Sequence, residues 1–310
     1  MTAPDRQTMS PLLARSWGCY DQTRFEESFK LATQSIQIED TPIHATPIPY
    51  IRIQKAIFHH AQAPSAECCR LLIQNLFEFP DHTLSQKIYL TMMDEYLASA
   101  YERLSTSSRS QLILGIGTGR CGSSTLTKIL KTQPVLSFFS HEHPARIKWV
   151  YQETRIAWQI QRLQLLAKYF NFFGDVSHWW LPHLNYIFKQ FPDAYVVILR
   201  RSKQETIQSF LKVKGSGAGA INHWKEHPGT YWIKNDWDEC YPKFDHATVE
   251  ECLSEYWELY YAQCERLAEK WPDNVMEFET EVLNDPVGQE KLLSFCGISE
   301  ATPITNLRLN

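Results

Sequence analysis

The sequence has 310 residues, of which 44% are apolar and 21% charged, a composition that excludes a disordered chain. Its formal net charge of −4 argues against nucleic acid or a membrane surface as the main partner. The first residues lack a continuous apolar stretch, and no run reaches the roughly 18 apolar residues of a membrane helix, so we expect a cytoplasmic protein. The eight cysteines show no Cys-x-x-Cys spacing, which predicts reduced thiols and no metal site.

The first hundred residues have helical rather than strand periodicity. Apolar spacing predicts helices over 25–36, 69–77 and 84–104. The Pro-rich segment 41–49 predicts an irregular loop, and the polar run 105–110 predicts a linker. We therefore expect a helical N-terminal extension over 1–108 and a second domain over 109–310. The extension could shape an acceptor pocket, form a homodimer or dock a carrier domain.

From residue 110 onward, strand and helix patterns alternate. Short apolar runs predict strands over 111–116, 194–199 and 275–278. Helical spacing predicts helices over 123–131, 248–271 and 287–296, with another that ends near 210. This alternation predicts an α/β fold with a central parallel sheet, in which ligands bind at the carboxyl ends of the strands.

A glycine-rich segment, Leu-Gly-Ile-Gly-Thr-Gly-Arg-Cys-Gly-Ser-Ser-Thr-Leu over 114–126, joins the first of these strands to a helix. Glycines let the backbone turn tightly and approach a ligand, and the first amides of the helix then point at a bound anion. Arg120 adds a fixed positive charge, and three hydroxyl side chains follow at 123–125. The segment therefore predicts a phosphate-binding loop.

The loop differs from the common nucleotide-triphosphate motif, Gly-x-x-x-x-Gly-Lys-Ser/Thr. Gly117 and Gly122 have the required spacing, but Ser123 occupies the lysine position. Without that lysine the β and γ phosphates are harder to hold, which disfavours an ordinary kinase or ATPase. A magnesium-dependent P-loop kinase and a nucleotide-binding scaffold without catalysis stay as the alternatives.

The segment Gly-Thr-Gly-Arg-Cys-Gly-Ser-Ser-Thr-Leu resembles the 5′-phosphosulfate loop of sulfotransferases, which use 3′-phosphoadenosine 5′-phosphosulfate (PAPS). The stretch 191–210 is similar to the family's 3′-phosphate motif, in which an arginine precedes a serine by eight residues, as Arg201 precedes Ser209. The stretch 271–286 looks like the family's late helix, strand and acidic turn. The family usually has Ser or Gly where this chain has Cys121, and often Pro where it has Lys203.

The resemblance implies a P-loop-type three-layer fold and in-line transfer of a sulfuryl group from PAPS, without a metal, to an acceptor hydroxyl of a small molecule or glycan. The residues that it assigns to PAPS binding are Gly119, Arg120, Cys121, Gly122, Ser123, Ser124, Thr125, Arg201 and Ser209. The forked, permanently charged side chain of Arg201 suits the 3′-phosphate. The alternative is that Arg201 pairs with a surface carboxylate and Ser209 is an ordinary helix residue.

The resemblance also implies three catalytic residues, Arg120, Glu142 and His178. Arg120 would neutralise the charge that grows on the bridging oxygen. Glu142 lies at the offset of the glutamate base in tyrosylprotein sulfotransferases, whereas His178 resembles the catalytic histidine of cytosolic members. Histidine has a pKa near neutral pH, and a glutamate needs burial to reach it. We favour Glu142 as the base and expect His178, His141 and His143 in the pocket; a structural role for each is the alternative.

The stretch 212–244 combines glycines with many aromatic side chains. Glycines give mobility and aromatics can cover an apolar acceptor, so the stretch predicts a lid or acceptor loop. The alternative is a surface loop with an aromatic cluster of its own.

Overall fold

The computed structural model describes residues 10–21, 24–39, 47–62, 72, 76, 82–105, 109–133, 136–142, 147–151, 153–215, 222–225, 237–299 and 302–304. These residues form two compact units, one that ends at Ala100 and one that begins at Tyr101. The domain boundary predicted at residue 108 stays a prediction. No helix in the described ranges is long and apolar enough to cross a membrane.

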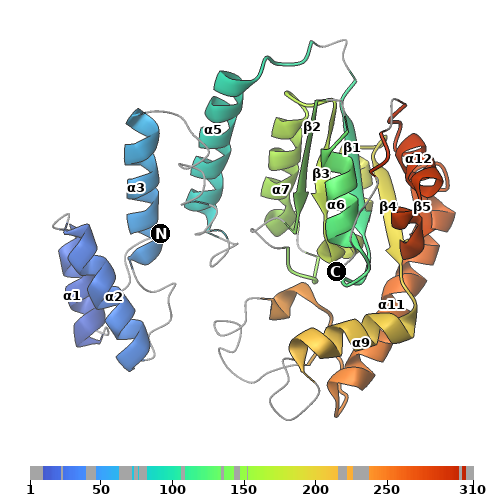
Figure 1. Cartoon of the computed structure of the whole chain (residues 1–310). Helices are drawn as coiled ribbons and strands as arrows, with labels where there is room; N and C mark the ends of the chain where they lie inside the picture. The colour runs from blue at the N-terminus through green and yellow to red at the C-terminus, as the bar shows by residue number, and fades with distance from the viewer. Residues whose placement is uncertain are drawn as a thin grey trace. The chain divides into compact units, whose positions relative to one another are not determined.

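The first unit is helical (Figure 1). Its main helices are α1 (Pro11–Asp21), α2 (Phe25–Glu39), α3 (Ile48–Gln62) and α5 (Thr83–Ala100). Helices α1 and α2 pack together where Ser16 and Ser28 each donate a hydroxyl hydrogen bond to the other's carbonyl oxygen at 2.8 Å. Both serines are fully buried, so these bonds satisfy hydroxyls that would otherwise destabilise the pair.

The sequence predicted part of this unit. The helix predicted over 25–36 is α2, but α1 and α3 were not predicted. The predicted end of the loop over 41–49 is wrong, because α3 already starts at Ile48. Pro49 lies in the first turn of α3, where a proline is tolerated. The helix predicted over 84–104 stops earlier, and the Leu104 N–H instead donates to the Lys168 carbonyl at 2.9 Å. The helix predicted over 69–77 lies almost wholly outside the described residues.

The second unit is built on a five-stranded parallel sheet. Its strands are β1 (Gln111–Ile116), β2 (Ser137–His141), β3 (Phe172–Val176), β4 (Tyr195–Arg200) and β5 (Val275–Glu279), in the order β2-β3-β1-β4-β5. The chain passes from central β1 to one side of the sheet and later returns to the other side, so β1 lies at the switch point of the topology. The predicted α/β fold with a central parallel sheet is confirmed.

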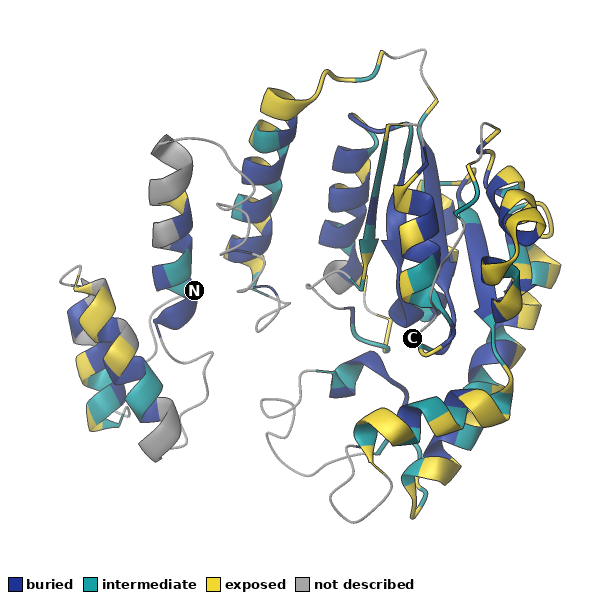
Figure 2. Cartoon of the chain, in the orientation of Figure 1, coloured by how far each residue is buried: buried dark blue, intermediate teal, exposed yellow. Residues whose placement is uncertain are grey.

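Helices cover both faces of this sheet (Figure 1). They are α6 (Ser123–Lys131), α7 (Glu153–Leu166), α8 (Leu184–Gln190), α9 (Lys203–Lys214), α11 (Val249–Lys270) and α12 (Pro286–Phe295), with short 3₁₀ segments η3 (His178–His183), η4 (Asp238–Cys240) and η5 (Thr280–Asn284). Ile113 packs in one core with Leu126 of α6 and Leu292 of α12. Leu112 and Leu114 point to the opposite face from Ile113 and are also buried, so both faces of β1 are covered. Figure 2 shows the strand in the dark blue of buried residues.

Strands β2 and β3 were not predicted. Each has only five residues, and their sequences, Ser-Phe-Phe-Ser-His and Phe-Phe-Gly-Asp-Val, contain residues that are uncommon in strands. Tertiary contacts stabilise them: the Asp175 carboxylate accepts from the hydroxyls of Ser140 and Ser177 and from the Trp180 indole N–H. The predicted strands correspond to β1, β4 and β5 and the predicted helices to α6, α9, α11 and α12, although α9 continues past 210 to Lys214.

Candidate active site

A cleft of about 440 Å³ opens at the carboxyl edge of the sheet. Its walls come from the segments that follow β1, β2, β4 and β5, and from α9. This is the edge at which ligands bind in open parallel sheets. The predicted site and pocket residues that line the cleft are Gly119, Arg120, Gly122, Ser123, Ser124, Thr125, His141, Glu142, Arg201 and Ser209.

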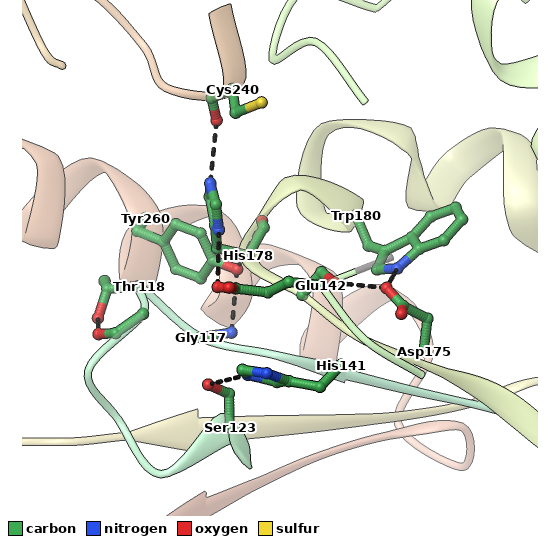
Figure 3. A network of polar contacts seen from close by, with 12 residues as sticks. Gly117, Thr118, Ser123, His141, Glu142, Asp175, His178, Trp180, Cys240 and Tyr260 are labelled. Atoms are coloured by element: carbon green, nitrogen blue, oxygen red, sulfur yellow. Dashed lines mark hydrogen bonds and ion pairs between the residues drawn. The ribbon is translucent and has the colours of Figure 1, made fainter. Parts of the chain in front are cut away.

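The loop after β1 leads into an open helix N-terminus. Gly122 is the N-cap of α6 with a φ of 88°, and no side chain caps this end of the helix. Amides in the first turn of a helix have no partner within the helix, and the helix dipole adds positive potential there. The Ser123 hydroxyl lies 3.0 Å from the His141 Nε2 atom (Figure 3). The loop therefore has the geometry of an anion-binding site.

Gly122 is required by both its backbone angle and its neighbours. A Cβ at this position would lie 2.8 Å from the Leu283 Cδ1 atom. Gly122→Ala should therefore lose the roughly 1–2 kcal/mol of a left-handed residue and a further steric contribution. Gly297→Ala is the matched control, because its φ is 75° but its nearest contact would be Tyr195 at 3.6 Å. Urea unfolding measures both losses, and equal losses would contradict the steric role of Leu283.

Two buried tyrosines of α11 form hydrogen bonds to the backbone of the loop after β1. The Tyr260 hydroxyl accepts from the Gly117 N–H at 3.0 Å and donates to the His178 carbonyl at 3.0 Å (Figure 3). The Tyr256 hydroxyl donates to the Thr118 carbonyl at 3.1 Å. In the sequence, both tyrosines are simply residues of the helix predicted over 248–271. Nothing in their spacing indicates that their hydroxyls reach a loop more than a hundred residues away.

Cys121 is the one predicted loop residue that does not line the cleft. Its side chain is buried in the core beside Leu126, and burial raises the pKa of its thiol to about 11. Its carbonyl accepts a 3.1 Å hydrogen bond from the Thr280 hydroxyl, which also donates to the Arg200 carbonyl at 3.0 Å. Cys121 therefore supports the loop from the core, and Thr280 links the loop after β1 to the end of β4.

Two arginines, Arg120 and Arg201, line the cleft beside the loop after β1. The Arg120 Nε atom donates to the Ser209 hydroxyl at 3.1 Å, and the Arg201 Nη1 atom donates to the Arg120 carbonyl at 3.0 Å. Arg201 also pairs with a carboxylate, Glu205, at 3.5 Å, which is the alternative role considered for it. Its role at a 3′-phosphate stays a prediction. Guanidinium groups brought together in one cleft favour a ligand with more than one negative charge.

Arg120 and Glu142 share an unusual backbone conformation. They are the non-glycine residues with positive φ in the described part of the chain, at 57° and 49°. Such conformations are costly for residues with a Cβ and persist where the surroundings enforce them, often at functional sites. At Glu142 the enforcing contact is its N–H, which donates to the Val176 carbonyl at 3.1 Å beyond the end of β2.

The two candidate bases occupy different environments. Glu142 lines the cleft, and its side chain is 29% exposed. His178 is fully buried and does not line the cleft; its Nδ1 atom lies 4.0 Å from the Glu142 Oε1 atom (Figure 3). Burial lowers the pKa of His178 to about 3, so this imidazole is neutral near pH 7. Only Glu142 can therefore touch a molecule in the cleft.

Several polar residues that were not predicted as site residues also line the cleft, and two of them, Lys214 and Tyr241, interact with Glu142. Lys214, at the end of α9, has its pKa lowered by burial, while Glu142 opposes and Arg120 adds to that shift. Tyr241 has its pKa raised by burial and by Glu142. Both were predicted only as part of a lid, and no motif marks them.

In the stretch 212–244, residues 222–225 and 237–244 are buried or half-buried, whereas Lys212 and Val213 at the end of α9 are exposed. Trp224 is fully buried and contacts the rings of Phe210 and Tyr241, both of which line the cleft. His223 is buried beside it and pairs with Asp238 at 2.8 Å. Residues 216–221 and 226–236, like the predicted pocket residue His143, lie outside the described residues.

Comparison with known proteins identifies the family of this site. The family model of the sulfotransferase domain matches residues 112–304, well over half of the chain. No curated protein matches the sequence significantly. The matched region includes every residue that lines the cleft. We conclude that the chain belongs to the sulfotransferase family, whose members transfer a sulfuryl group from PAPS.

Proposed function

We propose that the cleft binds PAPS with its 5′-phosphosulfate on the loop 119–125 and its 3′-phosphate at Arg201 and Ser209, and that Glu142 takes the proton of an acceptor hydroxyl. The observation that supports this assignment best is the meeting of Arg120 and Arg201 beside an uncapped helix N-terminus. One anion site would suit a simple phosphate. Two adjacent sites suit a nucleotide that is charged at both its 5′ and 3′ positions.

The side chains present fit such a nucleotide. Gly119 and Gly122 adopt positive φ without a Cβ on either side of Arg120, so the backbone of the loop can approach a ligand closely. Arg201 offers a planar fork of donors, the geometry that matches a phosphate group. The Ser209 hydroxyl lies one hydrogen bond from Arg120, within reach of the same ligand.

The catalytic step follows from these positions. PAPS supplies the sulfuryl group, whose bond to the 5′-phosphate oxygen breaks as the acceptor oxygen bonds to sulfur. Glu142 accepts the proton that the acceptor hydroxyl loses. Arg120 stabilises the negative charge that develops on the departing phosphate oxygen, as preorganised donors do in related transfers.

Aromatic side chains line the part of the cleft where we place the acceptor. Trp237 and Tyr241 line it together with Val213, whose side chain is exposed. Aromatic faces next to a base provide a packing surface for a ring that bears a hydroxyl group. This supports a small molecule or a sugar unit of a glycan as the acceptor.

Thermal unfolding with different nucleotides tests the proposal. The product 3′-phosphoadenosine 5′-phosphate (PAP), at a hundred times its dissociation constant, should stabilise the protein by about 2.7 kcal/mol, whereas 5′-AMP at the same concentration should stabilise it less. A preference for Mg-ATP would instead favour the P-loop kinase. No response to any of the three nucleotides would favour the scaffold.

A further inference from the structure

The buried ring of His178 is held in one orientation. It stacks on Tyr241, with 4.3 Å between ring centroids and 12° between planes. Its Nε2 atom lies 3.2 Å from the Cys240 carbonyl oxygen (Figure 3). A carbonyl oxygen can only accept, so the ring hydrogen must be on Nε2. The other ring nitrogen, Nδ1, then carries a lone pair.

The Nδ1 lone pair is directed at Glu142. The atom is buried, has no hydrogen-bond partner in the described part of the chain, and lies 4.0 Å from the Glu142 Oε1 atom. Because the imidazole is neutral, this contact is not an ion pair near neutral pH. A carboxylate oxygen and an imidazole lone pair repel each other, which agrees with a separation longer than a hydrogen bond.

Protonation of Glu142 turns its repulsion from the His178 Nδ1 lone pair into an attraction. The carboxylic acid has an O–H group, and the lone pair that faces it is an acceptor without a partner. The acid form therefore gains a hydrogen bond, while the carboxylate form has only repulsion there. Both effects increase the proton affinity of Glu142, which is what a glutamate base needs to work near neutral pH.

We propose that His178 is a positioning residue of the sulfotransferase reaction, whose Nδ1 atom accepts a hydrogen bond from Glu142 once Glu142 has taken the acceptor's proton. The proton stays on Glu142, and His178 remains neutral throughout. This role rests on the proposed function, because it requires Glu142 to be the base. It also explains why a histidine excluded from the cleft lies beside the one carboxylate that was predicted to be catalytic.

Other ionisable groups also act on the pair. Lys214, Tyr241 and Cys121 interact electrostatically with Glu142, and Arg120 acts on the same Lys214 and Tyr241. Those that act on His178 are His141 and His223. The Lys214 ammonium favours the carboxylate form of Glu142 and thus opposes His178. Its presence makes a compensating acceptor useful, since without one it would keep the base weak.

The test is the pH profile of kcat/KM in the His178→Phe variant. Phenylalanine keeps a ring against Tyr241 but has no lone pair. The acidic limb, which reports the pKa of the base in the free enzyme, should move by about one pH unit toward acid, the size expected for one hydrogen bond. The plateau should fall as well, because the base becomes weaker.

His183 offers a matched control in the same 3₁₀ segment. It is also buried, its Nε2 atom donates to the Lys148 carbonyl at 2.9 Å, and its Nδ1 atom has no hydrogen-bond partner among the described residues. Its ring packs against Tyr151 instead of facing Glu142. His183→Phe should leave the acidic limb where it is. Equal shifts in both variants, or no shift in His178→Phe, would overturn the proposed role.

A measurement on the unmodified protein serves if His178→Phe does not fold. In ¹⁵N nuclear magnetic resonance of histidine-labelled protein, His178 should be neutral with its hydrogen on Nε2, and its Nδ1 signal should change as Glu142 becomes protonated at low pH. A hydrogen on Nδ1 near neutral pH would overturn the proposal. The Glu142→Gln variant distinguishes a failure of the proposed function from a failure of the role of His178. If Glu142→Gln stays active, Glu142 is not the base. If Glu142→Gln is inactive but the acidic limb of the pH profile does not move in His178→Phe, only the role of His178 is refuted.

Discussion

Glu142→Gln is expected to lower kcat by about 10²–10⁴-fold while the affinity for PAP stays unchanged. Glutamine has the size and shape of glutamate and tolerates the φ of 49° no worse, but it cannot take a proton. The loss should therefore appear in the chemical step alone. PAP release in the presence of PAPS and an acceptor measures kcat, and thermal unfolding with PAP measures binding.

Glu290→Gln is the control for this change. It makes the same substitution on the exposed side of α12, outside the cleft, and should leave both quantities unchanged. If Glu142→Gln keeps kcat within a few-fold of the unmodified enzyme, the base lies elsewhere. If it weakens PAP binding as strongly as it lowers kcat, Glu142 supports the nucleotide site rather than the acceptor.

Arg201→Gln is expected to weaken PAP binding by about 10–150-fold, which corresponds to the roughly 1.5–3 kcal/mol of a hydrogen bond to a charged group. Binding of 5′-AMP should change little, because that nucleotide has no 3′-phosphate for Arg201 to hold. Isothermal titration calorimetry with both nucleotides gives the two changes on one scale. Their difference isolates the contact with the 3′-phosphate.

Arg201 also donates to the Arg120 carbonyl, which gives this experiment a second informative outcome. Equal weakening of PAP and 5′-AMP would mean that Arg201 acts by supporting the loop after β1 rather than by holding the 3′-phosphate. Arg266→Gln is the control, since Arg266 is an exposed arginine of α11 away from the cleft. It should leave the affinity for both nucleotides unchanged.

Local patterns in the sequence were enough to predict the nucleotide side of the cleft. The glycines and hydroxyls of the loop 117–125 are contiguous, and their chemistry needs only a strand before them and a helix after them. The predicted bounds of that strand and helix agree with β1 and α6. Arg201 and Ser209 lie on one short stretch, Arg201 just before the N-cap of α9 and Ser209 within that helix, so the sequence already places them in one region.

The acceptor side depends on contacts between distant parts of the chain. Glu142 and His178 are equally plausible bases by residue type, and burial distinguishes them. That burial comes from Cys240 and Tyr241, which lie some sixty residues beyond His178. No periodicity or spacing encodes such contacts.

The same difference between local and long-range interactions holds for the rest of the molecule. Fold class, family and the phosphate-binding loop follow from short-range patterns of glycine, hydroxyl and apolar residues, and they were predicted. The short strands β2 and β3, the tyrosine hydroxyls behind the loop and the protonation state of His178 depend on which distant groups meet. Burial and hydrogen-bond pairing are properties of the assembled core, so only the structure shows that Glu142 lines the cleft while His178 is buried.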